Sequence, residues 1–405
     1  MKILFVCVSV PFPANIGQRM RNCSLIRALR AECHEVVILA FGNEAEAAAA
    51  RSGLAGLCED IEVIGEVKRP ANHGRLGALF SRLPYGAWRM RSPRMRQAVS
   101  ERLAREHFDL VLCDDIYLFE NLPKASPVPV ILNKHTIVTE EFERFVQRQR
   151  NPCIAAYGWS ECRRLRRLEC AACSNVGAVW ACSERDRQIL LRYNHAVPVA
   201  VVPNVVDVAE YKATENDDGR TVVYVGAMDW LPNRDAVEFF VFNVMPELRR
   251  LRPEARFVVA GREPPSAFRK RLERVPGVSF TGTLPDLRPQ IGQAAVCAVP
   301  LRIGSGTRLK IIEAAAMAKA VVSTTIGAEG LSLKDRVEII IADEPKEFAR
   351  EIATLLADRQ RRLKLGQAAR KHVNAQYGIP ALRRSLREAL NFMRDQRHVL
   401  DTAAG

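Results

Sequence analysis

The stretch from residue 304 to residue 317 constrains the fold of this chain more than any other. It reads Gly-Ser-Gly-Thr-Arg-Leu-Lys-Ile-Ile-Glu-Ala-Ala-Ala-Met. Its two glycines allow the backbone to turn tightly, and the apolar residues Leu309, Ile312 and Ala316 recur at helical spacing. A short run rich in β-branched residues follows at 319–325 and predicts a buried strand. The stretch therefore predicts a glycine loop that opens a helix, with a strand after it.

The start of this predicted helix has the properties of an anion site. The first turn of a helix presents N–H groups that lack an intrahelical partner, together with a positive potential, and both suit phosphate. At about 100° per residue, Gly306, Lys310 and Glu313 share one stripe of the helix. A rise of about 1.5 Å per residue puts Glu313 roughly 9 Å from Thr307, about the reach from a diphosphate to the far hydroxyls of a ribose. We predict a nucleotide diphosphate site; the alternative is an ordinary surface ion pair beside a plain turn.

This stretch resembles the second domain of the retaining nucleotide-sugar glycosyltransferases of family four, in the exopolysaccharide and lipopolysaccharide type of branch. That family carries a Glu-x7-Glu motif, and its second glutamate, which holds the donor ribose, falls on Glu313. Ser305 stands where the first glutamate would be. The resemblance implies an α/β chain of the GT-B fold, with two facing Rossmann-like domains and a deep interdomain cleft. It also implies retention at the sugar carbon without a metal or other cofactor, and the chain has no Asp-x-Asp element.

Two motifs in the first half extend the resemblance. Gly17 and Arg21 fall where the family has a glycine near the donor phosphates and an arginine just inside a helix; the alternative is a plain turn and a surface arginine. His135 follows a predicted strand within Asn-Lys-His-Thr and resembles the histidine that faces the donor sugar across the cleft. A lone histidine is more often structural. We predict that His135 positions and hydrogen-bonds the sugar rather than acting as a general base.

In the second half, glycines that follow predicted strands are expected to line the nucleotide site. Arg234 is the only basic residue near the first of these strands, so the neutralisation of the departing diphosphate is assigned to Arg308 and Lys310. The predicted catalytic residues are His135, Lys310 and Arg308. The predicted donor-binding residues are Gly17, Gly226, Gly261, Gly282, Gly304, Ser305, Gly306, Thr307 and Glu313.

The order of strands and helices predicts a parallel sheet in each half of the chain. The segment Pro-Asn-Val-Val-Asp at 203–207 resembles the family's interdomain linker, and a polar stretch follows it. We expect an acceptor-binding domain over residues 1–200 and a nucleotide-sugar-binding domain over 201–375. The C-terminal helices, about 376–405, are expected to pack back on the first domain.

Composition narrows the class of protein further. Of 405 residues, 48% are hydrophobic and 26% are charged, which is typical of a soluble globular protein. The 11 cysteines have no regular spacing, which favours reduced thiols and a cytoplasmic location. No run approaches the roughly 18 apolar residues of a membrane-spanning helix. A net charge of +14 with arginine clusters in 82–105 and 144–167 suits anionic lipid headgroups, phosphorylated acceptors or nucleic acid, although solvated helix faces are an equal alternative.

These observations predict a glycosyltransferase that moves a sugar from a nucleotide diphosphate donor to a glycan or lipid-linked acceptor. We expect it to serve cell-surface polysaccharide or glycoconjugate synthesis, in the cytoplasm or peripherally on the inner face of the membrane. A nucleotide-sugar epimerase or hydrolase on the same scaffold is one alternative. A basic nucleic-acid-binding protein is another alternative. The arginine clusters, however, lack interleaved aromatic residues and any recognisable nucleic-acid-binding motif, so no nucleic-acid partner is predicted.

Overall fold

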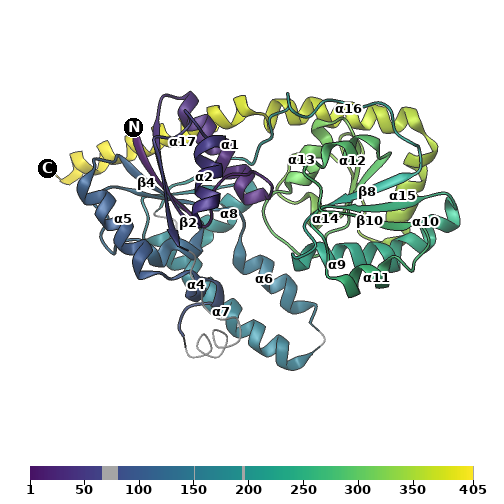
Figure 1. Ribbon diagram of the computed structural model, residues 1–405, viewed down its shortest axis with the longest axis horizontal. Coiled ribbons are helices and arrows are strands. Elements are labelled where there is room, and N and C mark those ends of the chain that lie inside the picture. The colour runs from purple at the N-terminus through teal and green to yellow at the C-terminus, as the bar shows by residue number, and fades with distance from the viewer. Residues whose placement is uncertain (66–80, 150, 194–196, 405) are drawn as a thin grey trace. The chain divides into compact units, whose positions relative to one another are not determined.

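The structure is a computed structural model that describes residues 1–65, 81–149, 151–193 and 197–404. Gly405, the end of the predicted C-terminal segment, lies outside the described residues. The chain divides into two compact units (Figure 1). Unit 1 comprises residues 1–204 and the segment from Leu382 onward, and unit 2 comprises residues 205–381. Each unit has its own parallel sheet, so the predicted α/β class with two Rossmann-like halves is confirmed.

The sheet of unit 1 has seven strands in the order β3-β2-β1-β4-β5-β6-β7, and each described pair of neighbours is parallel. A parallel sheet is covered on both faces, so its strands are continuous apolar runs. In β1 this run is Lys-Ile-Leu-Phe-Val-Cys, buried from its second residue onward. The strands are β1 (Lys2–Cys7), β2 (Glu35–Gly42), β3 (Asp60–Gly65), β4 (Leu110–Asp114), β5 (Val130–Asn133), β6 (Ala178–Ala181) and β7 (Val199–Val201).

Helices connect these strands, and the last helix of the chain lies beside the first. Arg383 Nε donates a 2.6 Å hydrogen bond to Glu32 Oε1 at the end of α1, which fixes α17 on unit 1 (Figure 1). The helices are α1 (Gly17–Ala31), α2 (Glu44–Gly53), α4 (Tyr85–Met90), α5 (Pro93–Arg105), the 3₁₀ helix η1 (Ile116–Asn121), α6 (Val138–Gln147), α7 (Pro152–Ser174), α8 (Glu184–Tyr193) and α17 (Ile379–Ala404).

Unit 2 repeats the pattern with six strands in the order β10-β9-β8-β11-β12-β13. Phe240 stacks on Phe257 in its core with ring centroids 4.0 Å apart. The strands are β8 (Thr221–Val225), β9 (Arg256–Ala260), β10 (Val278–Gly282), β11 (Val296–Val299), β12 (Ala320–Ser323) and β13 (Ile340–Ile341). The helices are α9 (Leu231–Phe239), the π-helical η2 (Phe240–Val244), α10 (Met245–Leu251), α11 (Ser266–Leu272), α12 (Arg288–Gln293), α13 (Leu309–Ala316), α14 (Thr325–Ala328), α15 (Pro345–Ala357) and α16 (Arg359–Gln376).

The strand order places a topological switch point in each sheet. All strands remain parallel, but successive strands are added toward one edge of the sheet up to β3 and toward the other edge from β4 onward in unit 1. The same change occurs between β10 and β11 in unit 2, so the switch points lie between β1 and β4 and between β8 and β11. Ligands of open α/β sheets bind beyond the carboxyl ends of the strands at such points.

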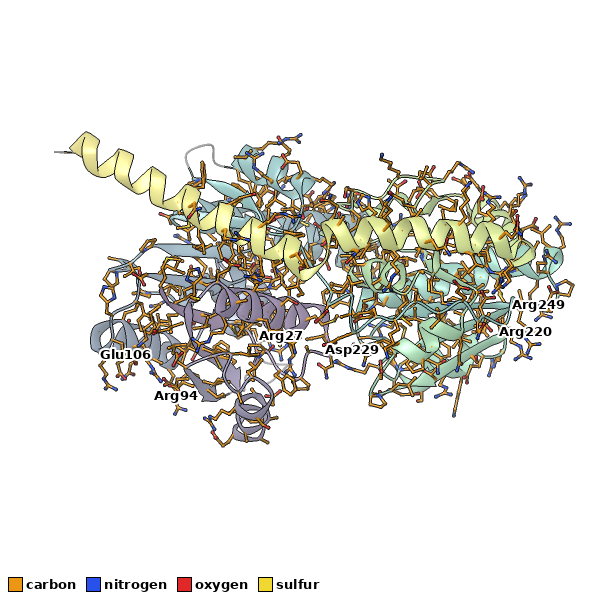
Figure 2. All side chains as sticks on the ribbon, turned by 90° about the horizontal axis from the view of Figure 1, so that it is seen from above. Arg27, Arg94, Glu106, Arg220, Asp229 and Arg249 are labelled. Atoms are coloured by element: carbon orange, nitrogen blue, oxygen red, sulfur yellow. The ribbon has the colours of Figure 1, made fainter. Side chains whose placement is uncertain are left out.

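Charged side chains cover the surface of both units (Figure 2), with Arg27, Arg94 and Arg220 among the exposed ones. In the part of the chain that is described, no helix combines the length and apolar character needed to cross a bilayer.

Candidate functional site

The glycine loop of unit 2 lies between β11 and α13, at the switch point of its sheet. Gly304 has φ of 141° and Gly306 has φ of 73°, values that side-chain-bearing residues rarely adopt, so both positions favour glycine. Ser305 and Thr307 are buried. The helix α13 begins at Leu309. The predicted transition from glycine loop to helix is confirmed.

Lys310 lies in the first turn of α13, and its ammonium contacts groups from β8 and α9. Nζ donates hydrogen bonds to Tyr224 Oη at 2.7 Å and to Asn233 Oδ1 at 3.1 Å. A Cβ built on Gly226 would lie 3.0 Å from the same Nζ, so the glycine leaves the space that the ammonium fills. A Cβ on Gly261 would lie 2.2 Å from the carbonyl oxygen of Gly226. The structure therefore brings together three residues predicted separately from the sequence: Gly226, Gly261 and Lys310.

The protonation of Lys310 is sensitive to its surroundings. Burial lowers the pKa of the ammonium to about 7, and the charge of Arg308 acts in the same direction, against an opposing effect of Glu313. Near neutral pH the side chain therefore exchanges readily between the amine and the ammonium. An anion beside Nζ would favour the ammonium.

Glu313 lies about one turn beyond Lys310 and is held by a residue that the sequence did not identify. Tyr211 Oη donates a 2.8 Å hydrogen bond to Glu313 Oε1. Burial raises the pKa of the Glu313 carboxyl above its usual value, although the hydrogen bond from Tyr211 and the charge of Lys310 oppose this. Burial also raises the pKa of the Tyr211 phenol, and Glu313 adds to that shift. Tyr211 thus remains a donor that orients the carboxylate.

Arg308 is turned back onto the glycine loop. Its Nη1 donates to the carbonyl oxygen of Gly306 at 2.6 Å and also to that of Ser305. A phosphate at the loop would have to compete with these carbonyl oxygens for the guanidinium. Arg308 therefore stabilises the conformation of the loop through its carbonyl groups. Lys310 is the cation that lies on the predicted stripe of α13 with Glu313.

Gly282 lies apart from the loop. It ends β10, which is three strands from β11 in the sheet order, or roughly 14 Å at a strand spacing of about 4.8 Å. A Cβ on Gly282 would meet Glu263 Oε2 at 2.6 Å. The structure thus groups Gly282 with Glu263 and not with Lys310.

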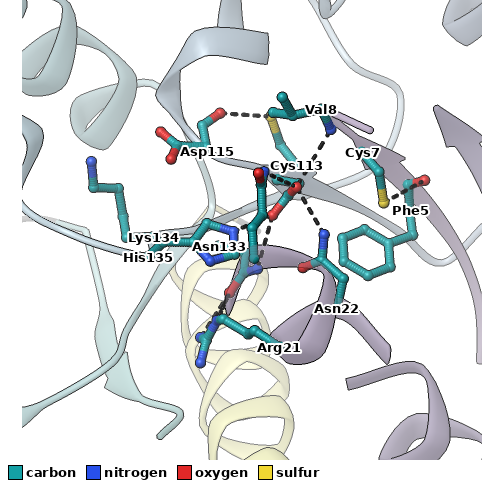
Figure 3. A network of polar contacts seen from close by, with 12 residues as sticks. Phe5, Cys7, Val8, Arg21, Asn22, Cys113, Asp115, Asn133, Lys134 and His135 are labelled. Carbon is teal, nitrogen blue, oxygen red and sulfur yellow. Dashed lines mark hydrogen bonds and ion pairs between the residues drawn. The ribbon is translucent and has the colours of Figure 1, made fainter. Parts of the chain in front are cut away.

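In unit 1, His135 belongs to a network of polar side chains centred on the buried carboxylate of Asp114 (Figure 3). Asp114 Oδ2 accepts from Gln18 Nε2 at 2.8 Å and from Asn22 Nδ2 at 2.9 Å. Asp114 Oδ1 pairs with His135 Nε2 and accepts from Asn133 Nδ2 at 3.3 Å. Because a carboxylate accepts hydrogen bonds, His135 carries a proton on Nε2.

The network lies at the switch point of the first sheet, since Asp114 ends β4 and Asn133 ends β5. Burial raises the pKa of Asp114, but the charge of His135 and hydrogen bonds from His135, Asn22 and Gln18 outweigh it and lower the pKa below its ordinary value. Gly17 is the exposed first residue of α1, next to Gln18. The structure therefore brings His135 and the side chain of Gln18, the residue after Gly17, to one carboxylate.

Arg21 lies inside α1, as the resemblance implies, and it is buried, so the alternative of a surface arginine is wrong. Its Nη2 donates to Asn133 Oδ1 at 2.8 Å. Its Nη1 donates to Val202 O at 2.9 Å and to Asn204 Oδ1 at 3.0 Å. Arg21 therefore links Asn133, at the end of β5, to Val202 and Asn204.

Two models of protein families match this chain. Residues 17–210 match the family model described as Glycosyltransferase Family 4, and residues 219–358 match the one described as Glycosyl transferases group 1. Among curated proteins, none matches the sequence.

Solved structures with the same fold cover nearly the whole chain. A sucrose-phosphate synthase from Thermosynechococcus elongatus is 17% identical, with a TM-score of 0.73 over 99% of this chain and 100% of its own. HepE from Anabaena, solved with UDP-glucose, is 16% identical, with a TM-score of 0.67 over 96% of this chain and 99% of its own. A mutant of S. aureus TarM, solved with Fondaparinux, alpha-GlcNAc-glycerol and UDP, is 11% identical, with a TM-score of 0.65 over 97% and 100%. From the two matched regions and the shared fold, we conclude that the chain is a GT4-like glycosyltransferase with the GT-B fold.

Proposed function

We propose that the protein transfers a hexose from a nucleotide diphosphate sugar to a glycan or lipid-linked acceptor, with retention at the sugar carbon and without a metal. The observation that carries this proposal is the placement of Lys310 and Glu313 on one face of α13, directly after the glycine loop. The amides of the loop and helix start, with the Lys310 ammonium, would neutralise the departing diphosphate. Glu313, oriented by Tyr211, would accept hydrogen bonds from the ribose.

Four further predicted residues, Gly226, Gly261, Arg308 and His135, have supporting roles in this proposal. Gly226 leaves the space that the Lys310 ammonium fills, and Gly261 allows the backbone of Gly226 to approach closely. Arg308 shapes the loop and offers a second cation if a phosphate displaces the loop carbonyls. His135 would position the sugar by a hydrogen bond, with its ring fixed by Asp114. Catalysis would then rest on charge stabilisation and on the orientation of the two substrates.

The acceptor and the cellular setting are part of the same proposal. We infer a role in cell-surface polysaccharide or glycoconjugate synthesis, in the cytoplasm and on the inner face of the membrane. Two solved proteins of this fold were crystallised with UDP or a UDP-sugar, which supports a nucleotide diphosphate donor. The excess of basic residues, 60 Lys and Arg against 46 Asp and Glu, supports an anionic acceptor or an anionic membrane surface.

A panel of UDP-, GDP-, ADP- and TDP-sugars tests the proposal by thermal shift, since a ligand that binds only the folded state raises the melting temperature. We expect one nucleotide class to stabilise the wild type and to lose its effect in Lys310→Ala. Lys364→Ala, at an exposed lysine of α16, is the matched control and should respond as the wild type does.

Product analysis with the stabilising donor then identifies the reaction. Transfer to an acceptor with the donor's anomeric configuration kept supports the proposal. Free sugar or an epimerised nucleotide sugar as the only product would favour the hydrolase or epimerase alternative, and an inverted linkage would contradict retention.

A further inference from the structure

Three large apolar side chains are exposed at the start of α7. Ile154, Tyr157 and Trp159 have exposed fractions of 47%, 36% and 45%. The first eight residues of α7, Pro-Cys-Ile-Ala-Ala-Tyr-Gly-Trp at 152–159, contain no charged residue. We call these two turns the α7 tip. Figure 1 shows that the hairpin of α6 and α7 extends away from the sheet of unit 1.

The α7 tip is a preformed helical end and not a frayed one. Asn151 is the N-cap, and its Oδ1 accepts hydrogen bonds from Cys153 N at 2.9 Å and Ile154 N at 3.4 Å. Only Gly158 of the tip is buried: a Cβ there would lie 2.4 Å from Val146 Cγ2 of α6. The helix α6 thus covers one side of the tip and leaves its aromatic residues exposed.

Arginines follow the tip along the same helix. At about 100° per residue, Arg163, Arg166 and Arg167 lie within about 80° of Trp159 around the helix axis. By the same measure Ile154 and Tyr157 lie about 140° and about 160° from Trp159, on the other side of the helix. All three arginines are exposed. Arg166 pairs with Glu143 at 2.6 Å, whereas Arg163 and Arg167 have no carboxylate within ion-pair distance in the described part of the chain. At about 1.5 Å per residue, Arg163 is roughly 6 Å and Arg167 roughly 12 Å beyond Trp159 along the axis.

We propose that the α7 tip docks on a bilayer rich in anionic phospholipid. Tryptophan and tyrosine prefer the boundary between headgroups and acyl chains. Because the exposed apolar side chains surround the helix axis and do not share one face, the tip enters this boundary end-on, to the depth of about 5–10 Å at which interfacial apolar groups are buried. With the tip at this depth, the arginines behind it lie at the level of the lipid phosphates, where each contributes about 1 kcal/mol. The capped first turn avoids unsatisfied backbone N–H groups near the acyl chains.

The same features disfavour other occupants. A second copy would bring its own arginines against these, since the chain carries a net charge of +14. A nucleic acid would pair with the arginines but gives no reason for the exposed Ile154. This inference deepens the proposed function by naming its membrane partner, and it rests on that proposal only for the acceptor that the membrane would present.

Vesicle co-sedimentation of the full-length protein, without any donor, tests the docking. We expect binding to vesicles of phosphatidylcholine with phosphatidylglycerol, at least tenfold weaker binding to phosphatidylcholine alone, and loss of binding between about 0.1 M and about 1 M salt. Combined Tyr157→Ala and Trp159→Ala substitution should weaken binding at least tenfold, as should combined Arg163→Glu and Arg167→Glu. Phe242→Ala is the matched control, because Phe242 of unit 2 is also 45% exposed.

Tryptophan fluorescence reports on the tip itself. The emission of the wild type should shift to shorter wavelength on anionic vesicles, and Trp159→Phe should abolish the shift while it preserves sedimentation. The inference would be overturned if the protein bound neutral vesicles as well as anionic ones, or did not bind anionic vesicles at all. It would also be overturned by binding to RNA but not to vesicles, or by a dimer that the Tyr157 and Trp159 substitutions dissociate. Nucleotide-sugar binding, measured on the wild type and the same variants, separates the two proposals. If the protein binds anionic vesicles but no nucleotide sugar, the proposed function is contradicted and the membrane docking is not.

Discussion

The ammonium of Lys310 stands 3.0 Å from the position that a Cβ on Gly226 would take. Gly226 follows β8 and Lys310 follows β11, so this contact spans the switch point of the second sheet. The nearest groups to such a Cβ, Asn233 Nδ2 at 2.9 Å and Lys310 Nζ, are both ends of flexible side chains. An added methyl group would therefore disturb the site more than the fold.

Gly226→Ala is expected to weaken the binding of the nucleotide diphosphate about tenfold, or about 1.4 kcal/mol, because the methyl group displaces the Lys310 ammonium. Its melting temperature should fall by only a few degrees. Gly261→Ala provides the contrast, because its Cβ would clash with a backbone carbonyl at a φ of 140°. Titration calorimetry and thermal melting of both variants check this; an unchanged dissociation constant in Gly226→Ala would contradict it.

The lowered pKa of Lys310 predicts proton uptake on binding. At pH 8 the free protein holds Lys310 mainly as the amine, since its pKa is about 7. A bound diphosphate stabilises the ammonium and raises this pKa, so the complex takes a proton from the buffer. Affinity should therefore fall as the pH rises above about 7. Calorimetry in buffers of different ionisation enthalpy should detect the uptake in the wild type and not in Lys310→Ala; uptake that persists in the variant would exclude Lys310 as its source.

The hydrogen bond from Tyr211 to Glu313 predicts a selective loss in Tyr211→Phe. The substitution keeps the ring but leaves the carboxylate without its 2.8 Å donor, so the ribose contact should loosen. We expect a several-fold weaker affinity for the nucleoside diphosphate, about 1 kcal/mol, and little change for inorganic pyrophosphate. Competition binding with both ligands measures the ratio, with Tyr193→Phe as the control. Equal loss for both ligands would show that Tyr211 acts on the whole site.

Asp114→Asn is expected to destabilise unit 1 by about 2–4 kcal/mol, because Gln18, Asn22 and His135 lose a buried, ionised acceptor. Since the folded-state pKa of Asp114 is lowered, its stabilising contribution is complete above the ordinary value of 3.8 and is lost as the pH falls through the folded pKa. The difference from the wild type should therefore shrink in acid. Urea denaturation across pH tests this, with exposed Glu254→Gln as the control.

Local patterns in the sequence were sufficient to predict the parallel sheets, the glycine loop and the stripe of α13. Buried parallel strands are continuous apolar runs, and α13 follows directly from glycines that need positive φ. The partners of these residues were not predictable in the same way. Tyr211 lies 102 residues before Glu313, and Tyr224 lies 86 residues before Lys310, so no spacing connects them.

Asp114 ends β4 in the structure, but the sequence alone does not indicate its role. Nothing local indicates that Gln18, Asn22 and His135 converge on one carboxylate, because α1, β4 and β5 meet only through the strand order. The surface alternative for Arg21 was wrong for the same reason: its partners Asn133 and Asn204 are 112 and 183 residues away. Long-range pairing of buried polar groups is decided by topology.

Titration calorimetry of UDP and of the other nucleoside diphosphates into the wild type, Lys310→Ala and Lys364→Ala tests the central claim most directly. The account predicts saturable binding of one nucleoside diphosphate by the wild type and Lys364→Ala, and at least tenfold weaker binding by Lys310→Ala. Equal affinity in all three proteins, or no binding of any nucleoside diphosphate, would contradict it.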